Sequence, residues 1–370
     1  MKKLALRFEQ RPDPSGWIVL FYSVLALLAA FFITGIIFWA YGVDPLVAYA
    51  KILKGSLGSQ FALFETLRRA IPLLLVGVGL ALCFRMLFWN IGAEGQLLMG
   101  AVGATWVALF SGIPEQFMVV SMFVVGALAG ALWGLIPALL RSKMAINEVI
   151  TTLMMNYIAA FIVVYLIQDP WRGTEKRGFA YTNTFPKAAW LETIGSSSVP
   201  WITLILGLLV AVGVYFLMDK TTVGYEIRVI GDNPRAGTYA GMGYTKATGL
   251  VMLISGGLAG LAGVGEMAGN HHFLLHPDQV SLGYGYTAIM VAWLARTNPL
   301  AAILTAFLFG AMMSGGDTIK ISLGIPFQVI GVINGLILFF IIASERLMHT
   351  RILLKSSLQA SPENPGGRSS

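Results

Sequence analysis

The sequence predicts an all-α protein that crosses a membrane repeatedly, as a bundle of about ten transmembrane helices with one or more of them broken. Only 12% of the 370 residues are charged and 56% are hydrophobic, whereas soluble domains contain about 25% charged residues. Several charge-free stretches are long enough to cross a bilayer, which takes about 20 apolar residues in a helix. The alternating pattern of membrane β-barrels is absent from the sequence.

Apolar stretches follow one another along almost the whole chain. The first begins after a basic segment and has no small-residue cleavage site, so we interpret it as a retained span and not as a signal peptide. The 42 glycines fit closely packed helices, because small residues allow helix backbones to approach each other. The expected spans are Trp17–Tyr41, Ala70–Phe84, Gly95–Pro114, Gln116–Leu140, Val149–Gln168, Thr193–Met218, Ala247–Gly265, Gln279–Ala295, Thr297–Gly316 and Ile321–Ser344.

This pattern divides the chain into three expected parts. Residues 1–16 are expected to form a cytoplasmic N-terminal segment, and residues 17–344 the transmembrane domain. Residues 345–370 are expected to form a cytoplasmic tail, whose Pro, Gly and Ser content predicts partial disorder.

The distribution of basic residues predicts the orientation. Placing both termini in the cytoplasm puts most of the 25 Lys and Arg residues on that side. The long connections Val43–Arg69 and Asp169–Glu192 then face outward, and Asp219–Lys246 faces inward. The net charge of +7 indicates contact with anionic membrane lipids, since no basic surface of the nucleic-acid-binding type is present in the sequence.

A polar stretch, "NIGAEGQ" at Asn90–Gln96, interrupts the apolar pattern. An unbroken helix would hold Arg85 and Glu94 in or near hydrocarbon, at about 2.5–3.5 kcal/mol per charge. Glycines permit a turn, and Asn90 and Gln96 can satisfy the freed backbone groups. The stretch therefore predicts a break in the helix path near the cytoplasmic face. It is either a tight turn in which Glu94 suits the start of the next helix, or a broken helix beside a solute path.

Polar residues also mark two spans. Glu148, Thr152 and Asn156 are four residues apart, so they form one stripe with steps of about 40° around a helix. Asn156 either makes a hydrogen bond between helices or, with Thr152, lines a path for a polar solute, whereas Glu148 suits the helix start. In the last span Gln328 and Asn334 are about 120° apart and cannot share a narrow stripe. Asn334 is the better path candidate, the alternative being close packing through neighbouring glycines.

The inward connection Asp219–Lys246 has the signals of a short helix. Asn233 is a favoured N-cap residue, and Pro234 suits the first helical position. Either Gly241 or Gly243 can end the helix.

Three stretches resemble a known family in their order and spacing. They are "FWNIGAEGQLLMGA" at Phe88–Ala101, "AINEVITTLMMNYIAA" at Ala145–Ala160 and "GDNPRAGTYAGM" at Gly231–Met242. These stretches resemble the membrane permeases of the bacterial ABC importers for simple sugars, branched-chain amino acids and nucleosides. The resemblance covers nearly the whole chain, from Leu20 to Ala343. The first two stretches are most similar to the nucleoside-type branch.

The resemblance implies a transport subunit of the bacterial cytoplasmic membrane that moves a small polar solute by alternating access. In the nucleoside-type branch the expected partners are a second permease, a cytoplasmic ATPase and a lipoprotein that binds purine nucleosides. A homodimer is the alternative to a heterodimer of permeases. ATP and Mg²⁺ would be bound by the ATPase, and this chain would bind no cofactor. Simple sugars and branched-chain amino acids are the alternative solutes.

The resemblance also assigns a role to the inward connection. In the family, the matching segment is the coupling helix, which docks in a cleft of the ATPase. Gly237 departs from the family pattern, where a second alanine is usual, while Arg228 and Arg235 are expected to meet acidic groups of the ATPase. The expected contact residues are Gly231, Asn233, Pro234, Arg235, Ala236, Ala240 and Gly241.

No stretch of the sequence predicts catalysis or a metal site. The phosphate-binding pattern G-x-x-x-x-G-K-[ST] is absent, so any ATP hydrolysis must come from another polypeptide. His272 and His276 are four residues apart, but Phe273 stands where a zinc protease has its glutamate. An ion-coupled transporter and an intramembrane enzyme are the other classes considered. Acidic residues lie at the ends of spans, which argues against ion coupling, and an enzyme lacks a nucleophile with a base.

Overall fold

The computed structural model describes residues 4–10, 15–174, 180–326, 328–348 and 350–356. The chain divides into two compact units, one of residues 1–34 and 335–370 and the other of residues 35–334. Within the described residues, eight helices are long and apolar enough to cross a membrane. The predicted polytopic helix bundle is therefore confirmed.

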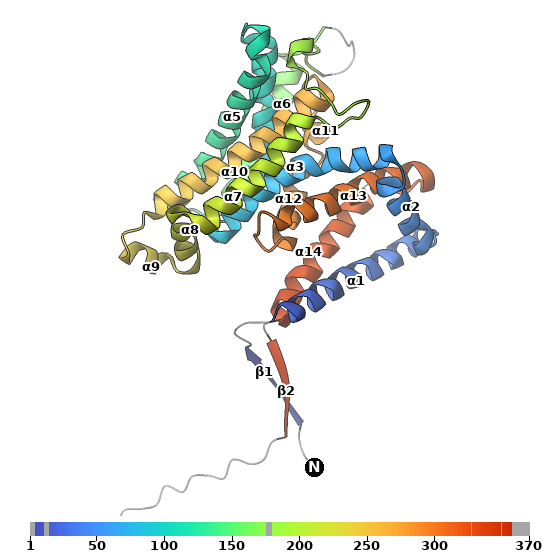
Figure 1. Ribbon diagram of the computed structural model, residues 1–370, viewed down its shortest axis with the longest axis vertical. Coiled ribbons are helices and arrows are strands. Elements are labelled where there is room, and N and C mark those ends of the chain that lie inside the picture. Colours follow the sequence, from blue (N-terminus) through green and yellow to red (C-terminus); the bar gives the residue numbers. More distant parts are fainter. Residues whose placement is uncertain (1–3, 11–14, 175–179, 327, 349, 357–370) are drawn as a thin grey trace, which may run out of the picture. The chain divides into compact units, whose positions relative to one another are not determined.

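Helices make up most of the part of the chain that the structure describes (Figure 1). A 3-10 turn, η1 (Lys187–Ala189), precedes α7, and a π-helix, η2 (Met267–His271), continues α10. The α-helices are α1 (Gly16–Ala40), α2 (Pro45–Leu57), α3 (Gln60–Arg85), α4 (Ala93–Phe110), α5 (Glu115–Met144), α6 (Glu148–Gln168), α7 (Trp201–Lys220), α8 (Thr222–Asp232), α9 (Pro234–Tyr239), α10 (Tyr244–Glu266), α11 (Pro277–Ser281), α12 (Tyr284–Leu294), α13 (Ala301–Leu323) and α14 (Gln328–Met348).

The first unit contains two strands that the sequence analysis did not predict. Strand β1 (Leu4–Gln10) pairs antiparallel with β2 (Thr350–Ser356), so that Leu4 lies opposite Ser356 and Gln10 opposite Thr350. Part of the expected disordered tail is therefore a strand. Residues 357–370 of that tail lie outside the described residues.

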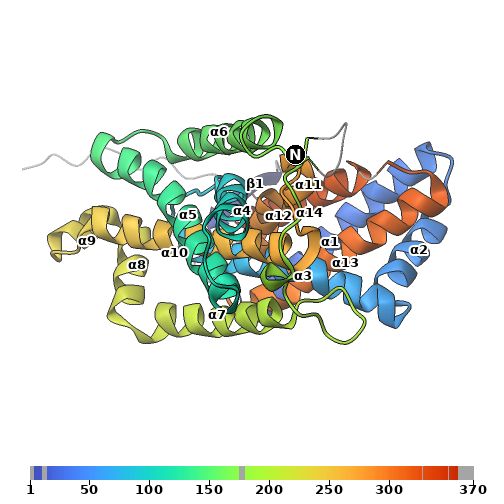
Figure 2. The same ribbon diagram turned by 90° about the horizontal axis from the view of Figure 1, so that it is seen from above.

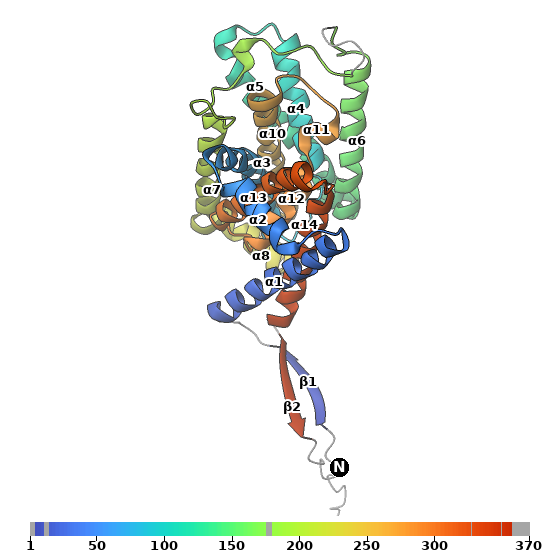
Figure 3. The same ribbon diagram turned by 90° about the vertical axis from the view of Figure 1, so that its right-hand side faces the viewer.

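Glycine contacts hold α4, α5 and α10 together. A Cβ added to Gly100 would overlap with the backbone of Gly260, and one added to Gly260 would overlap with the backbone of Gly126. Gly130 and Gly256 face each other in the same way. In lipid no hydrophobic effect drives helices together, so close backbone approach must supply the van der Waals attraction. Figures 2 and 3 show α6 and α7 on opposite sides of this group.

Two regions differ from the sequence-based expectation. Val43–Arg69, expected to be a connection, contains α2 and the first turns of α3, because Asp44 and Ser59 cap these helices. The Asp44 carboxylate accepts from the Leu46 N–H at 2.8 Å, and the Ser59 hydroxyl accepts from the Ala62 N–H at 3.1 Å.

The second difference concerns Gln279–Ala295, which was expected to be one span. The chain forms α11 and α12 instead, interrupted at Leu282 and Gly283. Both residues have left-handed φ angles, 46° and 75°, and this backbone conformation ends a right-handed helix. The beginning of α12 therefore lies inside the region where a continuous span was expected.

We expect Gly260→Ala to destabilise the second unit by about 1–3 kcal/mol, because the added methyl group overpacks the contact with Gly126. The measurement is the apparent melting temperature of the protein purified in detergent. Gly213→Ala is the matched control, since no atom lies within 4 Å of a Cβ added at this position in α7. Equal melting temperatures of the two variants would contradict the proposed dependence on backbone contact.

Candidate path and coupling sites

The predicted break is present but lies earlier than expected, since α3 ends at Arg85 and α4 begins at Ala93, before Glu94 and Gln96. Asn90 is fully buried and Gln96 is buried beside it. The Asn90 side chain donates to Gln96 Oε1 at 3.1 Å and to Ser255 Oγ of α10 at 3.2 Å, and it accepts from the Gly92 N–H at 3.0 Å. Two amides predicted from the sequence thus satisfy each other and the backbone of the break.

The polar stripe of α6 faces this break. Thr152 Oγ1 accepts from the Ile91 N–H at 3.2 Å, and Asn156 Oδ1 accepts from the Gly95 N–H at 2.8 Å. The Asn156 amide also donates to the Ile91 carbonyl at 2.9 Å and to the Tyr286 hydroxyl at 3.3 Å. The hydrogen bond between helices, one of the two alternatives for Asn156, is therefore confirmed. Asn156 satisfies an N–H group at the beginning of α4 that has no partner within the helix.

Glu94 connects the beginnings of α4 and α12. The sequence analysis did not select it as a site residue. Its side chain is buried in the first turn of α4. Oε2 accepts from the Gly285 N–H, in the first turn of α12, at 2.7 Å. The carboxylate thus lies at the N-terminal ends of two helices, where their dipoles stabilise negative charge. The sequence did contain a signal for this role, namely an acidic residue inside the predicted break.

The remaining path candidates lie elsewhere. Gln328 is exposed at the beginning of α14, and Asn334 is buried further along the same helix. Within the described residues, Asn334 Oδ1 has no hydrogen-bond partner. The structure therefore brings together four of the six predicted path residues, and not these two.

The segment Asp219–Lys246 forms the predicted short helix, α9, preceded by α8, which was not predicted. The Asn233 side chain accepts from the backbone N–H groups of Arg235 and Ala236 at 3.1 and 3.2 Å. Gly241 follows with a φ of 78°, which is the conformation of a glycine after a helix end. The predicted cap and stop are both confirmed.

Most of the predicted coupling residues are exposed, including Pro234, Arg235 and Ala236 of α9 and Ala240 directly after it. Gly237 is buried, and a Cβ there would lie 2.9 Å from the Ile230 side chain of α8. The departure from alanine at this position therefore allows α9 to pack on α8.

Two residues of α8 contact other parts of the chain. A Cβ added to Gly231 would overlap with the Arg85 carbonyl oxygen and lie 3.1 Å from Met86 Cα, so α8 touches the end of α3 just before the break. Arg228 was expected to meet an acidic group of a partner. Within the chain its guanidinium donates to the Met218 carbonyl at 2.7 Å and pairs with Asp219 at 3.2 Å, because the turn between α7 and α8 brings them together. The expected contact with a partner stays a prediction.

The long connection before α7 is attached to the segment that follows α10. Backbone bonds run from the Phe185 N–H to the His272 carbonyl at 2.7 Å and from the Leu191 N–H to the Ala268 carbonyl at 2.9 Å. The Trp190 and His272 rings are stacked, with centroids 3.9 Å apart. Burial lowers the pKa of His272, so a neutral imidazole lies on the indole at neutral pH.

Among the described residues, eight helices could cross a membrane, and buried polar side chains bond the beginnings of α4 and α12. These features define a membrane protein with polar groups held inside the bundle. Residues 62–342 match the family model described as "Branched-chain amino acid transport system / permease component". The chain therefore belongs to this family of ABC transporter permeases. This assignment replaces the ion-coupled transporter and the intramembrane enzyme considered above.

Several named relatives are similar over most of their length. The glucose ABC transporter permease protein TsgB13 of Haloferax volcanii is 35% identical over 94% of this chain and 93% of its own. The guanosine ABC transporter permease protein NupP of Bacillus subtilis is 32% identical over 88% and 93%. The nucleoside ABC transporter permease protein NupB of Lactococcus lactis is 31% identical over 86% and 89%.

We expect Asn156→Leu to lower the melting temperature, because it leaves the Gly95 N–H and the Ile91 carbonyl without partners at about 1–3 kcal/mol each. Met154→Leu, at an exposed position of the same helix, is the control. Uptake into proteoliposomes is measured in parallel. If Asn156→Leu melts like the control while uptake falls, Asn156 acts on the solute and not on the break.

Proposed function

We propose that this chain is one permease subunit of an ATP-driven importer for purine nucleosides in the bacterial cytoplasmic membrane. The observation that carries the proposal is the pair of stretches at Asn90–Gln96 and Glu148–Asn156, which resemble the nucleoside-type branch and lie in contact with each other. Two relatives named for guanosine or nucleoside transport match nearly the whole chain. Glucose is the second candidate solute, because TsgB13 is also similar along nearly its full length.

The solute path is proposed to pass the break between α3 and α4. Asn90, Gln96, Thr152 and Asn156 gather there, and the exposed side of the same α6 helix carries large apolar residues such as Phe161. Gln328 and Asn334 of α14 are the further candidates for this path.

Alternating access would then move the helices beside the break without covalent chemistry. Weak contact with the solute suits this task, because tight binding midway would hold the solute in the membrane. A solute-binding lipoprotein would deliver the nucleoside from outside, and the permease dimer would release it into the cytoplasm.

We propose that ATP hydrolysis acts on the permease through α9. Its exposed residues Arg235, Ala236 and Ala240 would dock on an ATPase subunit, which binds ATP and Mg²⁺. Gly231 places α8 in backbone contact with Arg85 at the end of α3, so a displacement of the coupling segment would reach the break directly. Both termini would lie on the same cytoplasmic side as α9.

We expect the double substitution Ala236→Trp and Ala240→Trp to abolish solute-stimulated ATP hydrolysis, because two large side chains on α9 prevent close docking. The permease should still insert in the membrane, while the ATPase should co-purify poorly. Thr222→Trp, at an exposed position at the start of α8, is the matched control and should retain association. Full association and stimulation in the double variant would place the ATPase contact elsewhere, for example at Arg141–Glu148.

The solute is tested on the binding protein that works with this permease. We expect purine nucleosides to raise its melting temperature, more so the tighter they bind, because a ligand that binds only the folded state stabilises it. Glucose and branched-chain amino acids are measured in the same series. Stabilisation by glucose and not by guanosine would assign the chain to sugar transport.

A further inference from the structure

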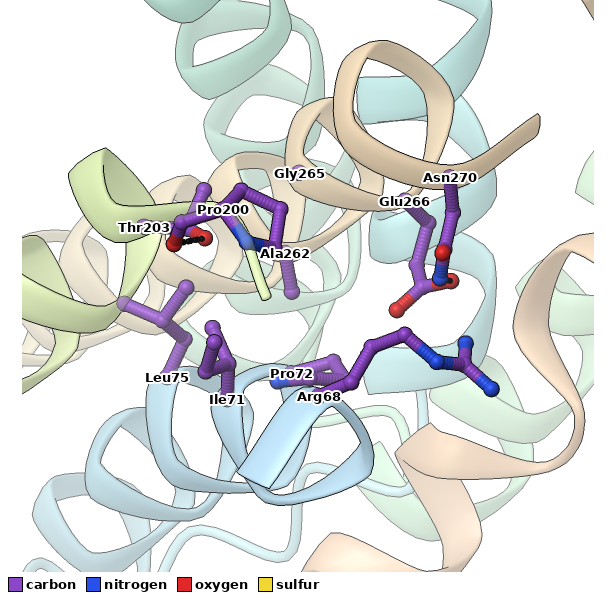
Figure 4. A pocket seen from close by; sticks show the side chains of 10 residues that line it. All are labelled: Arg68, Ile71, Pro72, Leu75, Pro200, Thr203, Ala262, Gly265, Glu266 and Asn270. Carbon is purple, nitrogen blue, oxygen red and sulfur yellow. Dashed lines mark hydrogen bonds between the residues drawn. The ribbon is translucent and has the colours of Figure 1, made fainter. Parts of the chain in front are cut away.

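A small pocket inside the second unit is lined by charged side chains and contains little free space. It lies between α3, the beginning of α7, α10 and η2 (Figure 4). Arg68 of α3 lines one side, and Glu266 and Asn270 line the other. The space open to the centre of a water molecule is about 10 Å³, close to what one water needs. The pocket therefore has room for one water molecule.

Glu266 has polar neighbours on η2 but no direct ion pair with Arg68. The side chain is 3% exposed, and Oε2 accepts from Asn270 Nδ2 at 2.9 Å. Its other neighbour is His271, whose Nε2 lies 3.7 Å away. Figure 4 shows the carboxyl group pointing toward Arg68 across the pocket. A buried carboxylate needs several hydrogen bonds, and Asn270 supplies one of them.

Arg68 is held from the opposite side. Its guanidinium donates to Glu65 Oε2 at 2.8 and 3.1 Å. Glu65 Oε1 in turn accepts from the Ser198 hydroxyl at 2.5 Å. These bonds satisfy some of the five N–H donors of the guanidinium. They also fix Arg68 beside the pocket.

Neighbouring polar atoms indicate that water enters this part of the bundle. Arg69 is 7% exposed and pairs with Asp317, yet its Nε and Nη1 have no partner within the described residues. The hydroxyl of Tyr284, which is fully buried, likewise has none there. Each such atom would cost about 1–3 kcal/mol if it stayed bare. Ordered water is the usual partner of buried polar groups of this kind.

We propose that an ordered water molecule occupies this pocket and bridges the Arg68 guanidinium to the Glu266 carboxylate. The water accepts from the guanidinium and donates to the carboxylate. The bridge fixes η2 against α3. Because Ala268 and His272 hold the loop Thr182–Leu191 by backbone hydrogen bonds, the position of that loop depends on the same water.

The first test is hydrogen exchange of the full-length protein in detergent, read by mass spectrometry. Glu266→Gln weakens the bridge while keeping the side chain's shape, and Arg68→Met removes it. We expect both to speed exchange about tenfold in peptides covering 182–191 and 268–275, since these segments then open more often. Exchange in the cytoplasmic half of α10 should not change. Glu115→Gln, an exposed charge change at the start of α5, is the control.

The second test asks whether Arg68 and Glu266 act together. In the double variant the exchange rate should be no higher than in the faster single variant, because the second substitution finds the bridge already lost. Additive effects would show that the two side chains act independently and would overturn the proposal.

A density map at a resolution that shows ordered solvent decides the nature of the bridge. Density for one water between Arg68 and Glu266 supports the proposal. A direct ion pair, or a pocket without density in a map that shows other buried waters, would refute it. None of these outcomes depends on the identity of the transported solute.

Discussion

The interior of this membrane protein depends on satisfying backbone groups at helix ends that lie inside the bundle. Bilayer hydrocarbon offers no hydrogen bonds, so a helix may begin at depth only where other protein groups take the place of water. Here α4 and α12 both begin in this way. The Asn156 amide accepts from the Gly95 N–H of α4, and the Glu94 carboxylate accepts from the Gly285 N–H of α12. Three helices, α4, α6 and α12, are thereby linked through two side chains.

The glycines help to meet the same requirement, because they allow the helices to approach each other closely. Because α4, α5 and α10 touch along their backbones at Gly100, Gly126 and Gly260, the polar residues of the break lie within reach of their partners. Asn90, for example, reaches Ser255 on α10 at 3.2 Å. Bulkier residues at the crossing would separate the helices and open those hydrogen bonds. Close packing and polar satisfaction are therefore coupled in this bundle.

The contact between Gly231 and the Arg85 carbonyl joins this interior to the segment proposed to meet the ATPase. A contact between two backbones cannot be absorbed by a change of side-chain rotamer, because neither contacting atom belongs to a side chain. Displacement of α8 must therefore move the end of α3 or break the contact. Since the polar break follows only a few residues later, it is the first part of the bundle that such a displacement would reach.

The sequence by itself determined the membrane class, the break that begins near Asn90 and the cap of α9. Each rests on local signals, namely hydropathy over a window, a polar insertion, or Asn233 followed by Pro234. It did not reveal α2, which with 13 residues is too short to cross a membrane, or the interruption at Leu282–Gly283, where a leucine in a left-handed conformation leaves no mark in the sequence.

Only the tertiary structure decided what the polar residues bind. Glu94 and Gly285 are 191 residues apart, and Gly95 and Asn156 are 61 apart, so no local pattern connects them. The same limit explains why the contact of Arg228 with Asp219 was not predicted from the sequence. Periodicity tells which residues share a face of one helix, whereas the partner of that face depends on how the other helices pack.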